Sequence, residues 1–385
     1  MISRLRLHDL RTYAALDLRV EARLVALAGE NGAGKTNLLE AISLLSPGRG
    51  LRRADPADLP RRGGSGGWAV AADVAPNPAP GGEDAGADPV RLGTGVEPGE
   101  SQRRHRVDGA PASAAAFADY LRLVWLTPDL DGLFRGPAGE RRRFLDRLVL
   151  AVDPAHAGRA TAYERALRSR NRLLEEERPD GAWLDALERE AAELGVALAA
   201  ARRETVDRLA GAIERSRGED ASPFPFAVVA LQGLVEDALG EGEPALAVEE
   251  MFRERLRLNR ARDRAAGRAV DGPHASDLAV RHGPKDVEAG LASTGEQKAL
   301  LIGLVLAHAA LVREMTGLQP TLLLDEVAAH LDPARRAALY ERLDALGAPV
   351  WMTGADRALF AALPGMGAGR AVLLEVAEGA VRARG

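Results

Sequence analysis

The chain has 385 residues, of which 46% are hydrophobic and 28% are charged, an ordinary composition for a globular protein. Its formal net charge of −5 excludes a uniformly basic surface, so any nucleic-acid-binding surface must be a local patch. The absence of cysteine excludes disulfides, thiolate metal sites and zinc hooks. No apolar run reaches the ~18 residues that span a bilayer, and the N-terminus has no signal-peptide core. We therefore expect a cytoplasmic protein without a membrane partner.

The first elements predict a phosphate-binding loop. Residues 2–8, 15–20 and 23–28 alternate apolar and polar side chains as short strands do. The third runs directly into a segment that fits the P-loop pattern, Gly29-Glu30-Asn31-Gly32-Ala33-Gly34-Lys35-Thr36. A helix is predicted from Thr36 to Leu45, which gives the strand, loop and helix order that a P-loop requires.

The residue types of this loop suit a triphosphate. Its glycines let backbone N–H groups point at phosphate oxygens, and the helix N-terminus adds its dipole. Lys35 would reach the β- and γ-phosphates as a catalytic residue, and the Thr36 hydroxyl would ligate Mg²⁺. Only three of the 51 basic residues are lysines (Lys35, Lys285 and Lys298), so a chance match to the pattern has a probability of about 1% or less.

The region after the P-loop helix mixes strands with a loop. Strands are predicted at 68–74 and 103–107. The low-complexity stretch 76–84 between them predicts a flexible loop and no site. A strand at 121–126 and an Arg-rich helix at 137–150 follow.

The middle of the chain predicts a helical hairpin. Long helices are expected at 154–178 and 182–216, separated by Pro179-Asp180-Gly181. Apolar residues follow 3-4 spacing over three heptads of the second helix. Such a hairpin would project about 35–50 Å, and a globular helical domain with an amphipathic core is the alternative. A further helix with seven arginines is predicted at 247–268.

The last part of the chain returns to an α/β pattern. The predicted elements are a strand at 277–282, a helix at 295–315, a strand ending at Asp325, a helix at 333–346, a strand at 349–353 and a strand pair within 371–383. Asp325 would hold the Mg²⁺ shell through water, and Glu326 would act as the general base. Two adjacent carboxylates alone would indicate only a helix N-terminal charge pair, but an apolar run that ends in three leucines precedes them.

Nearly 290 residues separate the P-loop from Asp325, although both must meet at one nucleotide. The chain must therefore make a long excursion and return. This predicts an α/β P-loop ATPase head assembled from both chain ends, with an inserted helical second domain. The expected parts are 1–150 and 271–385 for the head and 151–270 for the insert.

A second anion site is predicted at Ser293-Thr294-Gly295-Glu296-Gln297-Lys298. A Ser followed by Gly at a helix start offers a hydroxyl and free N–H groups, although alone it indicates a plain N-cap. Because the P-loop already supplies one phosphate cradle, this segment would meet another face of the nucleotide or the ATP of another subunit. It predicts a head-to-tail pair of heads that enclose two ATP molecules.

These segments resemble the ABC-type ATPase heads of chromosome and repair proteins, and most closely the RecF family. The resemblance covers essentially the whole chain. Its motifs are Gly29–Thr36, Leu38-Leu39-Glu40-Ala41-Ile42, Gly48-Arg49, Arg141-Arg142-Arg143-Phe144-Leu145-Asp146, Gly272-Pro273-His274 with Ser276-Asp277-Leu278, Ser293–Lys298 and Leu331-Asp332. The arginine-rich and Gly-Pro-His segments are the most specific of these.

The resemblance implies an ATP-dependent homodimer that binds double-stranded DNA and hydrolyses ATP slowly. It would act at gaps and arrested replication forks with RecO and RecR, helping RecA to load. By the same resemblance, Gly29 to Thr36 bind phosphate, Asp325 serves Mg²⁺ and Glu326 serves hydrolysis. Ser293 and Gly295 act as the trans signature, and Asp332 lies at the dimer seam.

Four positions depart from the expected pattern. Thr294 and Glu296 replace the Gly and Gln of a typical ABC signature, and Thr353 stands where transporters carry His. Ala275 stands where family members often have Arg. These departures put fast turnover in doubt more than binding, and they favour a switch over a motor.

The candidates for DNA contact are arginines at 52–53, at 103–106 and on the 141–147 helix, each of which could instead be an ordinary solvated or paired residue. Contacts of this kind would be directed to the DNA backbone and sensitive to salt. Other classes of protein remain open: a transporter ATPase subunit, a long coiled-coil chromosome protein, a non-enzymatic adaptor, or an ABC ATPase coupled to a protein partner instead of DNA.

Overall fold

The computed structural model describes residues 1–75, 88–217, 224–365 and 369–383, so the predicted loop at 76–84 lies outside the described residues. The chain divides into two compact units. The first comprises Met1–Asp131, Ala221–Phe224 and Leu301–Gly385, and the second comprises Gly132–Asp220 and Pro225–Leu300. The finer division at 150 and 270 stays a prediction.

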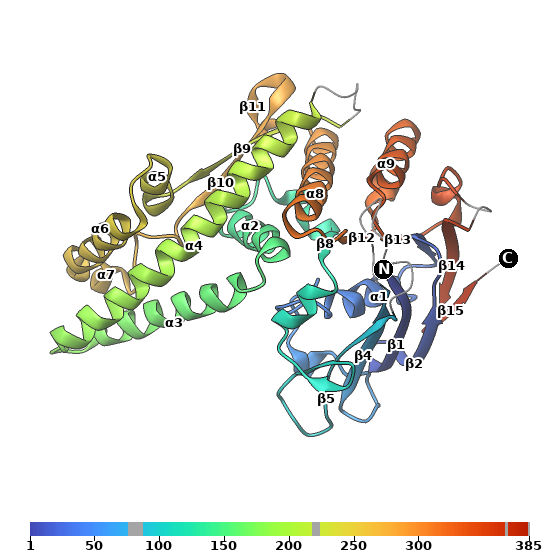
Figure 1. Cartoon of the computed structure of the whole chain (residues 1–385), viewed down its shortest axis with the longest axis horizontal. Helices are drawn as coiled ribbons and strands as arrows, with labels where there is room; N and C mark the ends of the chain where they lie inside the picture. The colour runs from blue at the N-terminus through green and yellow to red at the C-terminus, as the bar shows by residue number, and fades with distance from the viewer. Residues whose placement is uncertain (76–87, 218–223, 366–368, 384–385) are drawn as a thin grey trace. The chain divides into compact units, whose positions relative to one another are not determined.

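A six-stranded sheet lies at the centre of the first unit, in the order β15-β14-β3-β13-β12-β8. Its strands run parallel except for β15, which pairs antiparallel with β14. They are β3 (Leu24–Ala28), β8 (Leu123–Leu126), β12 (Thr321–Leu324), β13 (Val350–Gly354), β14 (Ala371–Ala377) and β15 (Ala380–Ala383). Strands from both chain ends share this sheet, so the prediction of an α/β head assembled from the two ends is confirmed (Figure 1).

The register of the parallel strands sets where the motifs lie. Leu27 of β3 is opposite Thr353 of β13, and Leu324 of β12 is opposite Met352. The carboxyl ends of these three strands therefore share one edge of the sheet, where ligands bind in open α/β folds. The P-loop follows β3 and leads into α1 (Lys35–Ser43), and Asp325 follows β12; α9 (Pro333–Leu346) comes after it along the chain.

A second sheet of the first unit is antiparallel, in the order β2-β1-β4-β5-β6-β7. Its strands are β1 (Ile2–Leu10), β2 (Tyr13–Arg19), β4 (Trp68–Val74), β5 (Val90–Val96), β6 (Arg104–Val107) and β7 (Ala110–Pro111). Sequence analysis missed β5, because Gly93 and Gly95 remove the side chains that would mark its alternation. At Gly95 a Cβ would collide with the Trp68 carbonyl of β4, so this glycine permits the strands to pair.

The second unit contains the predicted helical hairpin. Its helices are α2 (Ala138–Val152), α3 (His156–Glu175), α4 (Gly181–Ser216), α5 (Leu234–Gly240), α6 (Ala245–Leu258) and α7 (Arg260–Ala266). Helices α3 and α4 lie side by side (Figure 1), and Asp180 caps α4 by accepting hydrogen bonds from two backbone N–H groups. A small antiparallel sheet, β11-β10-β9, completes the unit with β9 (Ala227–Gln232), β10 (Asp277–His282) and β11 (Val287–Glu288). Strand β9 was not predicted.

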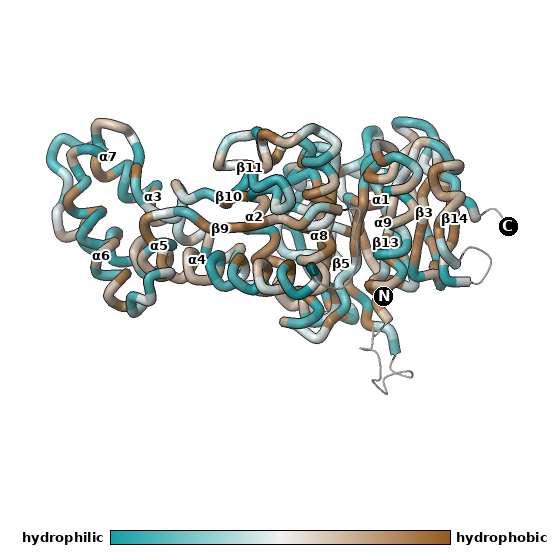
Figure 2. Tube along the Cα trace, turned by 90° about the horizontal axis from the view of Figure 1, so that it is seen from above, coloured by the Kyte–Doolittle hydropathy of each residue, from teal (hydrophilic) through white to brown (hydrophobic). Residues whose placement is uncertain are grey.

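The single helix predicted at 247–268 is wrong, because α6 and α7 are separated at Asn259. The Asn259 amide donates a 2.8 Å hydrogen bond to Asp271, a contact that competes with helix propagation. The hydrophilic colouring of α7 in Figure 2 reflects its arginines. Six of the seven predicted arginines bond to a carboxylate or a carbonyl of the same unit: Arg253, Arg255, Arg257, Arg260, Arg262 and Arg264.

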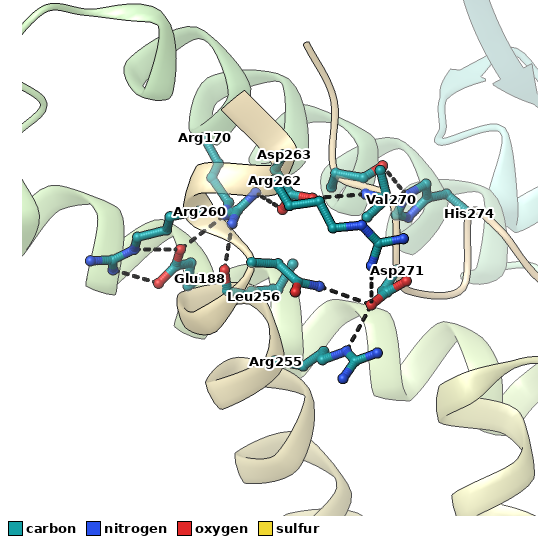
Figure 3. Close-up of polar contacts among 12 residues, drawn as sticks. Arg170, Glu188, Arg255, Leu256, Arg260, Arg262, Asp263, Val270, Asp271 and His274 are labelled. Carbon is teal, nitrogen blue, oxygen red and sulfur yellow. Dashed lines mark hydrogen bonds and ion pairs between the residues drawn. The ribbon is translucent and has the colours of Figure 1, made fainter. Parts of the chain in front are cut away.

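A polar network inside the second unit connects four helices, α3, α4, α6 and α7 (Figure 3). Arg170 of α3 is fully buried and donates hydrogen bonds to Glu188 of α4 and to Asp263 of α7. Its third contact is the backbone carbonyl of Leu256, at 2.6 Å. Arg170, which interrupts the apolar spacing of α3, is therefore a buried structural residue.

Helix α8 (Thr294–Thr316) departs from the expectation that no apolar run is long enough to span a bilayer. It has 23 residues, and the mean hydropathy of its most apolar window is 1.6. Among the described residues it is the one helix that is both long enough and apolar enough to cross a membrane. Of that window, 61% is buried, as in the core helix of a globular protein. One such helix is weak evidence for a membrane span.

Candidate nucleotide-binding site

Residues 29–36 form a curled loop at the start of α1. Gly32 and Gly34 have φ angles of 85° and 110°, a region that side chains rarely adopt. At Gly34 a Cβ would come within 2.9 Å of the Thr12 hydroxyl oxygen and 3.0 Å of the Tyr13 hydroxyl oxygen. The Tyr13 hydroxyl also donates a 3.1 Å hydrogen bond to the Gly34 carbonyl. The β1–β2 turn thus supports the loop, a role that the sequence pattern does not reveal.

Lys35 is 4% exposed, and its ammonium group is held inside the loop. Its Nζ donates hydrogen bonds to the carbonyls of Gly29, at 2.6 Å, and Glu30, at 2.8 Å. A side chain at Gly29 would collide with the Val376 carbonyl. Helix α1 has no acidic residue in its first turn, so the positive end of its dipole is not neutralised there. Together the loop, the ammonium and the helix end make an anion site.

Asp325 meets the P-loop through Thr36. The Thr36 hydroxyl donates a 2.9 Å hydrogen bond to Oδ1 of Asp325, which lies 289 residues further along the chain. Asp325 is buried, and this burial raises its pKa above the usual value, while hydrogen bonds from Thr353 and Thr36 act in the opposite direction. The structure therefore brings together the two residues that the sequence assigns to Mg²⁺.

Glu326 lies beside this pair in a strained backbone conformation. Its φ is 53°, in the left-handed region that non-glycine residues seldom occupy. Its N–H donates a 2.9 Å hydrogen bond to the Thr353 hydroxyl. Glu326 lines a pocket of about 150 Å³. The other lining residues are Arg52, Asn37 and five residues of the P-loop, namely Asn31, Gly32, Gly34, Lys35 and Thr36. The predicted base and the predicted phosphate-binding residues thus share one pocket.

The donor set at this pocket fits Mg²⁺. This ion prefers oxygen ligands and usually keeps several waters, so the protein supplies only one or two groups beside the phosphates of the substrate. The Thr36 hydroxyl and the Asp325 carboxylate are two such oxygens next to an anion cradle. Among the described residues, no group of three or more His, Asp or Glu side chains is placed to hold a metal ion.

A buried carboxylate on α1 organises two arginines near the loop. Glu40 is 1% exposed and receives two hydrogen bonds from Arg11, at 2.7 and 2.8 Å. Arg52 contacts the same carboxylate at 3.2 Å and donates a 2.7 Å hydrogen bond to Asn37. Arg52, a candidate for DNA contact, therefore also lines the P-loop pocket, where a cation suits an anionic ligand.

Arg103, another candidate, is used inside the first unit. Its guanidinium donates hydrogen bonds to the Thr94 hydroxyl at 2.8 Å and to the carbonyls of Gly48, at 2.7 Å, and Leu44. Burial lowers the pKa of Arg103 to about 10. Because Leu44 follows α1 directly, Arg103 satisfies carbonyls at the C-terminal end of the P-loop helix.

Most of the other candidate arginines also have partners within their own unit. Arg104 pairs with Glu100 at 2.5 Å, and Arg141 pairs through two bonds with Asp277. These contacts do not test DNA binding, so the assignment of individual arginines to DNA stays a prediction.

The predicted signature residues Ser293 and Gly295 belong to the second unit. Ser293 forms a reciprocal capping box with Glu296: its hydroxyl and N–H both donate to Oε2 of Glu296, and the N–H of Glu296 donates back to the hydroxyl. Lys285 lies 2.5 Å from the other carboxylate oxygen. The hydrogen bonds from Lys285 and Ser293 lower the pKa of Glu296 to about 2. The Ser-x-x-Glu spacing could have indicated this cap, but nothing local indicated Lys285.

Asp332 has a local role in the structure. Its side chain accepts a 2.9 Å hydrogen bond from the N–H of Arg335 and so caps α9. The side chain is half exposed. Its predicted place at a dimer seam stays a prediction.

Comparisons with known proteins agree with this geometry. Residues 1–351 match the family described as the RecF/RecN/SMC N terminal domain. A solved structure of "the recombination mediator protein RecF-ATPrS in RecFOR pathway" has a TM-score of 0.84 at 21% identity, covering 100% of this chain and 98% of its own. An Smc head bound to the C-winged helix domain of ScpA has a TM-score of 0.53 at 15% identity, covering 100% and 96%. The fold is therefore that of the RecF and SMC heads.

Two curated relatives give the narrower assignment. The DNA replication and repair protein RecF of Rhizobium meliloti (strain 1021) is 53% identical over 384 residues, covering 99% of this chain and 98% of the relative. The protein of the same name from Mesorhizobium japonicum is 53% identical over 383 residues, covering 99% and 97%. The chain belongs to the RecF family of DNA replication and repair proteins.

Proposed function

We propose that the chain binds ATP with Mg²⁺ at the P-loop pocket of the first unit. The observation that carries the proposal is the 2.9 Å hydrogen bond from Thr36 to Asp325. It joins the phosphate-binding loop to a carboxylate 289 residues further along the chain, as a shared Mg²⁺ site requires. Thr36 and Asp325 would hold the Mg²⁺, which neutralises phosphate charge when bound. Lys35 would exchange its two carbonyl partners for phosphate oxygens.

The same pocket supports slow hydrolysis of ATP. Glu326 lines it beside the P-loop, where a carboxylate could accept a proton from an attacking water. We assign a switch and not a motor, in keeping with the departures at Thr294, Glu296 and Thr353. The capping box also engages the Ser293 hydroxyl, which must be released before it can contact phosphate.

We further propose that ATP promotes a homodimer that binds double-stranded DNA in the cytoplasm. Ser293 and Gly295 would act in trans on the ATP of the partner, with Asp332 near the seam and residues 151–270 as the helical insert between the two parts of the head. The names of the curated relatives support a role in DNA replication and repair. The solved RecF structures belong to the RecFOR pathway, which supports RecO and RecR as partners. Assistance to RecA loading is proposed from the family resemblance.

Two binding measurements test the proposal. The first is equilibrium binding of a fluorescent ATP analogue in the presence of Mg²⁺, and the second is binding of a fluorescent DNA duplex with ATP, with ADP and without nucleotide. Lys35→Arg should weaken both, because a planar guanidinium cannot take the place of a compact ammonium between two loop carbonyls. Arg257→Lys on an exposed, ion-paired face of α6 is the conservative control.

The outcomes separate the two halves of the proposal. ATP binding with no duplex binding in any nucleotide state at low salt would keep the ATPase head and remove the DNA function. The protein-coupled ATPase would then become the better reading. Failure of the wild-type chain to bind ATP would contradict the site itself.

A further inference from the structure

Thr353 lies at the carboxyl end of β13, an interior strand of the central sheet. It is 1% exposed and lies near the end of β13, between the strands that lead to the P-loop and to Asp325. Its hydroxyl donates a 2.7 Å hydrogen bond to Oδ1 of Asp325 and accepts a 2.9 Å hydrogen bond from the N–H of Glu326. One side chain therefore contacts both members of the acidic pair.

The chemistry of a threonine hydroxyl suits this double contact. It carries one proton to donate and two lone pairs to accept, so both hydrogen bonds can exist together. Threonine is also β-branched and stiff at χ1, and the backbone of Thr353 pairs in register with Leu27 of the neighbouring strand β3. The hydroxyl is thus held at a defined point on a rigid element, which is how precise sites are built.

The contact with Glu326 has a second consequence. Glu326 has a φ of 53°, a conformation that persists only where surrounding structure determines it. The bond from its N–H to Thr353 fixes the start of this turn, and the turn sets the direction of the Glu326 side chain. Asp325 keeps a further hydrogen bond from Thr36, so it is less dependent on Thr353 than Glu326 is.

We infer that Thr353 is a positioning residue for ATP hydrolysis, which holds Asp325 and Glu326 in one arrangement through a single hydroxyl. The inference rests on the proposed ATP binding at the P-loop. The residue stands where transporters carry His, and the contact observed here is made to the two carboxylate residues from within the sheet. Its removal should impair turnover much more than nucleotide binding, because Lys35 and the loop backbone do not depend on it.

The test is a comparison of Thr353→Val and Thr353→Ser in single-turnover hydrolysis of ATP with excess protein, together with equilibrium binding of the same nucleotide. Valine preserves shape and removes the hydroxyl, so the hydrolysis rate should fall by roughly 10–100-fold, the usual loss for a supporting hydrogen bond. The dissociation constant for ATP should change by less than about threefold, since a partner bond from Thr36 remains. Serine keeps the hydroxyl and should restore most of the rate.

Thr321→Val is the matched control, because Thr321 is a buried threonine at the opposite end of β12 from Asp325. If Thr353→Val does not fold, Thr353→Ala replaces it, with circular dichroism as the check on folding. Unchanged hydrolysis in the variant without the hydroxyl, or equal loss in the serine and valine variants, would overturn the inference and leave ATP binding intact. A wild-type chain that binds no ATP would overturn both the proposed function and this inference.

Discussion

The buried guanidinium of Arg170 offers a sharp test of how the helical unit is stabilised. Arg170 on α3 bonds to Glu188 on α4 and Asp263 on α7, and the exposed fraction of each of these side chains is 0–1% (Figure 3). Arg170→Met would keep much of the side-chain volume and remove the charge. The two carboxylates would keep other partners, since Arg260 contacts Glu188 and the Val270 N–H contacts Asp263.

The expected cost follows from the physics of buried ion pairs. Removing one partner leaves charge uncompensated in a low-dielectric interior and typically costs 3–5 kcal/mol, so we expect about 3 kcal/mol here because Arg260 still compensates Glu188. The Leu256 carbonyl also loses its 2.6 Å hydrogen bond. Arg257→Met breaks an exposed pair with Glu254 and should cost far less, because solvent screens that pair.

Hydrogen exchange followed by mass spectrometry is the better assay, because a chain with two units need not unfold in one transition. Arg170→Met should accelerate exchange in α3 and α7 and leave β3 and β13 in the first unit unchanged. Arg257→Met should leave all four elements close to wild type. Equal exchange rates in the two variants would mean that burial does not determine how much these ion pairs contribute to stability, and would refute the reasoning.

Three further outcomes are expected. Burial alone would raise the pKa of Asp146, but hydrogen bonds from His156 and Arg202 outweigh it and lower the pKa to about 2. This shift corresponds to about 2 kcal/mol of folding stability above pH 4, which is lost as the pH falls toward 2. Asp146→Asn should therefore lower the unfolding free energy at pH 7, and urea titrations at pH 5 and pH 3 should find this deficit narrowing. Arg103→Met should lower the melting temperature because the carbonyl of the buried Leu44 loses a partner, at a cost of about 1–3 kcal/mol, unlike loss of an exposed arginine. Gly195→Ala should also melt earlier, because its Cβ would lie 2.8 Å from a buried phenylalanine ring atom.

The fold was predictable where the local pattern and the tertiary environment agree. Buried parallel strands such as β3 and β12 are short apolar runs that end in recognisable motifs, so their place in one sheet follows from the chemistry of the nucleotide. Strand β5 has glycines where alternation would appear, and its pairing depends on close approach to β4. The break at Asn259 depends on Asp271, a partner that no helical periodicity reveals.

The candidate site divides in the same way. Lys35, Thr36 and Asp325 carry their signals in adjacent residues, and sequence reasoning found them. Tyr13 and Thr353 contact residues distant in sequence through their hydroxyl groups, so the tertiary structure is needed to identify them. The sequence showed that Thr353 stands where transporters carry His, but it did not show that Thr353 contacts Asp325 and Glu326.

The three lysines make a related point about chemistry in an arginine-rich chain. Lys35 lies between two carbonyl oxygens of its own loop, Lys285 contacts the carboxylate of the capping box, and Lys298 is buried near the start of α8. Elsewhere, arginines such as Arg170 and Arg103 use several donors of the planar fork at once. A flexible ammonium is suited to exchanging a few carbonyl partners for phosphate oxygens, whereas a fork fixed by three partners is suited to holding helices together. An ammonium at Lys35 thus suits the proposed exchange of partners, and the guanidinium forks of Arg170 and Arg103 suit fixed contacts.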